Sequence, residues 1–127
     1  MWNTLLLAVL SFALLVECVM TAAGFFVPTM MLEKFQIVAD HGTLFLGHVI
    51  AWFLLLVDGM ILYAILAIRR RDPHGWTMTR FLSGWWVLLG ISIYIFFGKP
   101  DNLFLDSLKG VVLLVAAHQS QPKQPNL

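Results

Sequence analysis

Apolar residues along this chain form four long runs, separated by short polar or proline-containing segments. A helix rises about 1.5 Å per residue, so roughly 17–25 apolar residues cross a hydrocarbon layer about 30 Å thick. The pattern therefore predicts an all-α, polytopic membrane protein, an antiparallel bundle of four transmembrane helices in one domain, residues 1–118. The predicted helices cover residues 2–26, 43–68, 78–97 and 102–118, and residues 119–127 are predicted to be a disordered polar tail.

The first apolar run ends just before Pro28, which lacks a backbone donor and commonly marks a helix boundary. A cleaved signal peptide is the alternative, because residues 21–24 are small like a cleavage site. No positively charged leader precedes the apolar core, so we expect the run to be retained as a membrane anchor.

The connections after the first and second predicted helices differ in length and composition. In residues 29–40, the apolar Met31, Phe35 and Val38 recur at helical spacing, which predicts a short amphipathic helix on the membrane surface; an ordered loop is the alternative. Asp40 and His41 are expected to cap the start of the second helix. The segment 69–73, which is charged and ends in proline, is expected to end that helix.

Composition agrees with a lipid environment and excludes some partners. Hydrophobic residues make up 60% of the chain and charged residues 12%, and the formal net charge is +1. The few basic residues form no nucleic-acid footprint. The single cysteine, Cys18, cannot form an internal disulfide, and we expect it to act as a small buried apolar residue.

The distribution of basic residues predicts the orientation. Translocation disfavours Lys and Arg in the flanks and loops on the outer side of the membrane. One face, which includes both termini, carries 69–71, Arg80 and Lys123, whereas the other carries Lys34 and Lys99. Both termini are therefore expected in the cytoplasm.

Several ionisable residues lie at hydrocarbon depth. An ionised side chain facing lipid costs about 2.5–3.5 kcal/mol even on insertion scales, so such groups should point inward or become neutral. If each run is centred in the membrane, one layer about 10 Å below the outer surface collects polar groups from all four helices. The predicted polar pocket comprises Glu17, His48, Tyr94, Asp106 and Lys109.

The residue types in this pocket suggest acid–base chemistry. Glu17 or Asp106 would be a general acid and His48 a base or proton relay. Lys109 could stabilise a developing negative charge and Tyr94 could donate a hydrogen bond.

Each of these residues also has a purely structural interpretation. Asp106 and Lys109 are three residues apart and could neutralise each other on their own helix. Glu17 could be a protonated carboxyl that fixes helix packing. Asp58 could be a packing hydrogen-bonder or a deeper floor of the pocket, and Trp52 is a further candidate for ligand binding.

The histidines predict no metal or haem site. His41 and His48 are two turns, roughly 10 Å, apart on one helix, too far to bind one ion together. His48 and His118 are expected near opposite membrane surfaces and so cannot share one haem. The sequence identifies no cofactor.

In length, helix count and layout, residues 1–118 resemble the DoxX-like family of small four-helix membrane proteins. The resemblance includes a long loop after the first helix, the break Arg69-Arg70-Arg71-Asp72-Pro73 after the second and a short turn before the last. It implies the fold; no catalytic motif of that family maps onto these residues.

Three classes of function are compatible with the sequence. The favoured one is an accessory or structural subunit, or a regulator, of a larger membrane complex, because the chain has short loops and no soluble domain. The second is an enzyme or binding protein for a lipophilic molecule such as a quinone, sterol or terpenoid. The third, an oligomeric transporter or proton pathway, ranks last because no inverted repeat is apparent.

Overall fold

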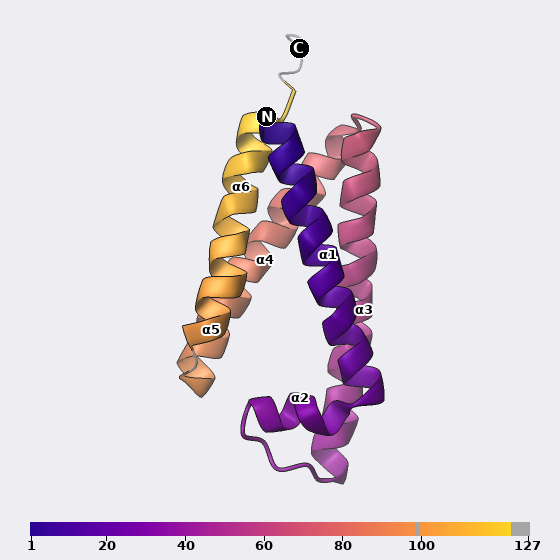
Figure 1. Ribbon diagram of the computed structural model, residues 1–127, viewed down its shortest axis with the longest axis vertical. Coiled ribbons are helices and arrows are strands. Elements are labelled where there is room, and N and C mark those ends of the chain that lie inside the picture. The colour runs from indigo at the N-terminus through magenta and orange to yellow at the C-terminus, as the bar shows by residue number, and fades with distance from the viewer. Residues whose placement is uncertain (99, 123–127) are drawn as a thin grey trace. The chain divides into compact units, whose positions relative to one another are not determined.

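The computed structural model describes residues 1–98 and 100–122, and Asn102 only through its backbone. Within these residues the regular structure is entirely helical (Figure 1). The elements are α1 (Trp2–Phe26), α2 (Pro28–Lys34), α3 (His41–Arg69), α4 (Pro73–Phe97), α5 (Pro100–Asn102), the π-helix η1 (Leu103–Ser107) and α6 (Leu108–Ser120). Helices α1, α3 and α4 and the segment Leu103–Ser120 are long and apolar enough to cross a membrane. The predicted all-α class with four membrane spans is confirmed.

Helix α4 begins at Pro73, five residues before the predicted start at 78. The carboxylate of Asp72 accepts a hydrogen bond from the backbone N–H of His74 at 3.0 Å, and Pro73 occupies the first helical position. Both are standard signals for a helix start. The sequence pattern predicts only that Asp72 and Pro73 end the preceding helix. They serve both functions, because α3 does end at Arg69.

Helix α3 begins at a side-chain cap. Asp40 Oδ1 accepts from the backbone N–H of Thr43 at 2.7 Å, and Thr43 Oγ1 accepts from the backbone N–H of Asp40 at 2.8 Å. Hydrogen bonds from Thr43 to the Asp40 carboxylate, led by the one from the Thr43 backbone N–H, lower the pKa of Asp40 below its ordinary value. The predicted capping role of Asp40 is confirmed.

The segment between α1 and α3 is partly helical. Helix α2 is shorter than the predicted 29–40 segment, and the chain leaves it through a turn at Gln36, whose φ is 58°. Leu32 is buried, whereas Glu33 and Lys34 are exposed. The amphipathic character is therefore present over two helical turns only.

The last span departs from regular α-helix. Residues Leu103–Ser107 form a π-helix, in which one extra residue is accommodated per turn, and Asp106 lies within it. The hydroxyl of Ser107 donates to the backbone carbonyl of Val87 on α4 at 3.0 Å. Helix α6 continues to Ser120, two residues beyond the predicted end. Residues 123–127 of the predicted tail lie outside the described residues.

The chain divides into two compact units, which we treat separately. The α1–α3 unit is Phe12–Leu62, and the α4–α6 unit combines Met1–Ser11 with the chain from Tyr63 onwards. Glycines set the closest helix approach in both. A Cβ added at Gly24 would lie 3.0 Å from the Ala51 Cβ, and one added at Gly110 would lie 2.6 Å from the Ser83 carbonyl oxygen. Figure 1 shows α4 and α6 side by side within their unit.

Candidate functional site

The α1–α3 unit contains a buried polar cluster of Glu17 and Thr21 on α1 and Asp58 on α3. The three residues are 6%, 6% and 8% exposed. Thr21 Oγ1 lies 2.7 Å from Asp58 Oδ2 and 2.8 Å from the backbone carbonyl oxygen of Glu17. The cluster therefore joins α1 to α3 through side-chain hydrogen bonds in the apolar part of both helices.

The geometry around Thr21 bears on the proton of Asp58. A threonine hydroxyl has one hydrogen and can donate to only one of its two close oxygen neighbours. Both contacts are hydrogen bonds when Thr21 donates to the Glu17 carbonyl oxygen and the O–H of a protonated Asp58 donates to Thr21 Oγ1. A neutral carboxyl is also the form that costs least in a buried apolar setting.

The second carboxyl oxygen of Asp58, Oδ1, is buried and has no hydrogen-bond partner among the described residues. Buried polar atoms are normally paired, so an unpaired acceptor marks a position where a donor could bind. Glu17 contributes its backbone carbonyl oxygen to the contact with Thr21, and its own side chain is buried. The cluster thus contains two buried acidic residues, and one carboxyl oxygen of Asp58 has no partner among the described residues.

His48 and Trp52 lie on the surface of the α1–α3 unit, nearer the start of α3 than Asp58. The Trp52 ring meets the Phe25 ring edge-on, at 5.2 Å between centroids and 84° between planes. The His48 ring lies 6.4 Å from the same Phe25 ring. Both side chains are exposed, Trp52 by 64%. They form an aromatic patch that faces away from the unit's interior.

The α4–α6 unit contains the other predicted polar residues. Lys109 Nζ lies 3.4 Å from Asp106 Oδ1, and their side chains are only 11% and 13% exposed. The same ammonium lies 4.3 Å from the centroid of the buried Trp86 ring. A desolvated cation over a tryptophan face gains about 2 kcal/mol. Lys109 is thus stabilised by a carboxylate and an aromatic ring, as in the structural interpretation of the Asp106–Lys109 pair.

The five residues of the predicted pocket are distributed over the two units. Of its five residues, Asp106 and Lys109 are in contact, Glu17 is buried, and His48 and Tyr94 are exposed, Tyr94 by 47%. The prediction that all five share one pocket stays a prediction, because they belong to different units. In the described residues no three His, Cys, Asp or Glu side chains are close enough to hold a metal ion.

Two partners in these clusters were not identified from the sequence. Thr21 carries no predicted role beside Glu17, because its bond to Asp58 depends on the pairing of α1 with α3. The sequence feature that points to Thr21 is its hydroxyl group, which lies within a largely apolar run. Trp86 carried no such signal, because tryptophans are common throughout the chain and only the α4–α6 register brings one over Lys109.

The helices and buried charges together define an all-α integral membrane protein with four candidate spans and two internal polar clusters. No protein-family model, curated protein or solved structure matches the chain.

Proposed function

We propose that this protein is an accessory or structural subunit of a larger membrane complex. The observation that carries the proposal is the small buried share of its spans. Between 22% and 33% of each membrane-spanning window is buried within the chain itself. The remaining apolar surface is available to lipid and to the helices of other subunits.

One face of α4 has the pattern of a helix-pairing surface. Phe81, Leu88 and Ile95 recur every seven residues and are 65%, 67% and 72% exposed, and Gly84 and Ile91 lie between them. A seven-residue repeat of this kind keeps one seam against a partner helix. A Cβ added at Gly84 would meet nothing within 4 Å, so the notch at Gly84 is open. We call these five residues the α4 seam and propose that it receives a helix of a partner subunit.

Two further features belong to this proposal. The basic residues of the flanks favour cytoplasmic termini. The DoxX-like resemblance supports a compact four-helix subunit and adds no catalytic group.

The proposal is tested by native mass spectrometry of the tagged protein, gently solubilised from its own membrane. We expect additional membrane subunits at fixed stoichiometry. Gly84→Leu should close the notch and reduce the co-purified partner, whereas Gly47→Leu should leave it unchanged, although Gly47 is equally open on α3. A monomer without partners, or equal partner retention by both variants, would contradict the proposal.

A second candidate is binding of a lipophilic molecule with a hydroxyl group, such as a quinol, sterol or terpenoid alcohol. The observation that favours it is the vacant acceptor Asp58 Oδ1, which a ligand hydroxyl could donate to. In this case the buried carboxyl of Asp58 or of Glu17 would serve as an acid toward the ligand. The catalytic roles of His48 and Asp106 depend on the same candidate.

Extraction of the purified protein and mass analysis of the extract tests this second candidate. A stoichiometric isoprenoid or sterol should be present in the wild type. It should be retained by Lys109→Gln but lost in Asp58→Leu, which removes the acceptor. An extract that holds only bulk phospholipid would rule the candidate out.

A further inference from the structure

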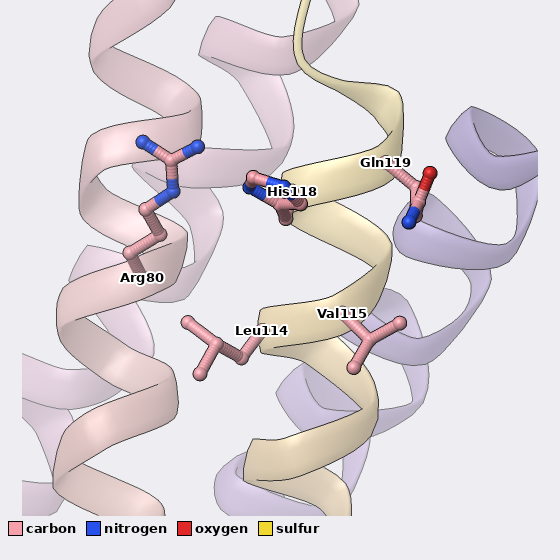
Figure 2. Close-up of a pocket in the computed structure, with 5 residues that line it drawn as sticks. All are labelled: Arg80, Leu114, Val115, His118 and Gln119. Carbon is pink, nitrogen blue, oxygen red and sulfur yellow. The ribbon is translucent and has the colours of Figure 1, made fainter.

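A shallow groove lies on the α4–α6 unit near the last turns of α6. Its volume is about 360 Å³, and it is lined by Arg80, Leu114, Val115, His118 and Gln119. Figure 2 shows Arg80 extending from α4 alongside His118 of α6, with Leu114 and Val115 one turn further down α6. The groove thus has cationic and polar groups at one end and an apolar floor at the other.

The two ends of the groove match the two parts of a phospholipid. Leu114 and Val115 are each 45% exposed, so their side chains offer an apolar surface to an acyl chain. Arg80 lies about 10 Å along α4 from Pro73, close enough to the helix end for its guanidinium to reach the headgroup region. Polar groups therefore lie toward the helix ends and apolar groups toward the membrane interior.

Two side-chain bonds hold the polar end in place. The Arg80 guanidinium donates to the side-chain carbonyl oxygen of Gln121, which follows α6. The Trp76 indole N–H donates to the hydroxyl of Ser120 at 3.1 Å. These bonds tie the end of α6 to α4, so the position of Arg80 beside His118 is fixed by the fold. Guanidinium groups have further N–H donors for a phosphate after one bond is made.

The charges of the groove select among phospholipids. None of the five lining residues is acidic, so no side chain there can pair with the choline or ethanolamine of a zwitterionic headgroup. An anionic headgroup needs no such partner. Arg69, Arg70 and Arg71, at the adjacent connection between α3 and α4, are exposed and add positive potential at this end.

We propose that this groove is a binding site for an anionic phospholipid. Arg80 and His118 hold the headgroup phosphate, Gln119 donates a further hydrogen bond, and one acyl chain runs over Leu114 and Val115. The site belongs to the α4–α6 unit alone and does not depend on the proposed function.

The test uses the full-length protein in lipid nanodiscs of phosphatidylcholine with an equal amount of phosphatidylglycerol, followed by native mass spectrometry of the released protein. The wild type should retain phosphatidylglycerol in preference to phosphatidylcholine. Arg80→Gln should lower the retained phosphatidylglycerol about tenfold, the effect of losing one charge-assisted hydrogen bond. Arg70→Gln is the matched control: it removes the same charge at the same end but outside the groove, so it weakens only the general potential and should lower retention clearly less than Arg80→Gln.

A second variant tests the groove without altering charge. Leu114→Trp should fill the apolar floor and reduce lipid retention while the Arg80–Gln121 bond stays in place. If Arg80→Gln fails to fold, lipid retention by Leu114→Trp tests the proposed site. Equal retention of the two lipids by the wild type, or equal losses in Arg80→Gln and Arg70→Gln, would overturn the proposal.

Discussion

At the scale of single residues, the bond between Thr21 and Asp58 shows how this protein accommodates an acid inside a membrane. The carboxyl is buried between α1 and α3, and its only described partner is a hydroxyl that has a second close acceptor. A neutral acid satisfies this arrangement, whereas an ionised one would leave an uncompensated charge in hydrocarbon. Lys109 meets the same problem differently, by pairing with Asp106 and the Trp86 ring.

The protonation of Asp58 can be observed directly. We expect the infrared difference spectrum between wild type and Asp58→Asn at neutral pH to contain the C=O stretch of a protonated carboxyl. Thr21→Val should shift that band, because it removes the hydroxyl that accepts from the Asp58 O–H. Asp101→Asn, at an exposed acid, is the control and should show carboxylate bands only. Carboxylate bands alone in the Asp58→Asn spectrum would show that the acid is ionised.

The residue types predict which acidic side chains are buried better than they predict which residues those side chains contact. Glu17, Asp58 and Asp106 were singled out because they interrupt apolar runs, and all three are at most 9% exposed. Their burial follows from the cost of exposing a charge to lipid. The partner of each depends on which residue of another helix reaches the same level, and that is a property of helix pairing.

At the scale of elements, the start of α4 depends on one ionised carboxylate. The backbone N–H of His74, and then its ring, hold the pKa of Asp72 below the ordinary 3.8. A lowered pKa in the folded state means that the stabilisation is complete above the ordinary value. It is lost as the pH falls through the lowered value.

Thermal unfolding in detergent at a series of pH values tests this cap. Between about pH 5 and pH 2, the melting temperature of the wild type should fall more steeply than that of Asp72→Asn, since asparagine caps a helix without titrating. Asp101→Asn should retain the wild-type slope. Identical slopes for wild type and Asp72→Asn would show that the cap contributes nothing measurable.

The contact between α4 and α6 depends on Gly110. A Cβ there would lie 2.6 Å from the Ser83 carbonyl oxygen and 2.8 Å from Val87 Cγ2. Gly110→Ala should therefore separate the helices and lower the free energy of unfolding by about 1–3 kcal/mol. Gly84→Ala, where the added methyl meets nothing, should leave it unchanged or raise it by up to about 1 kcal/mol. The free energies of unfolding of both variants, measured in mixed micelles, give the comparison. Equal changes in the two variants would show that the α4–α6 contact does not depend on Gly110.

At the scale of the whole molecule, four membrane crossings would place both termini on one side of the membrane. The excess of arginine at the connection between α3 and α4 and at Arg80 predicts the cytoplasmic side. A fluorescent protein fused to the C-terminus should therefore fluoresce, and an alkaline phosphatase fusion at the same position should be inactive. Replacing residues 69–71 with glutamine should weaken this preference. An active phosphatase fusion would reverse the predicted orientation.

The pattern of apolar residues determined the helical class, the four spans and the limits of α1, because the bilayer imposes a length and a solvent on each segment. It also indicated which charges had to be hidden. Tertiary structure alone decided that Thr21 meets Asp58, that Trp86 covers Lys109, and that Arg80 borders a groove with His118. The physical reason is that burial is a property of one residue and its solvent, whereas contact depends on how two helices rotate and slide against each other.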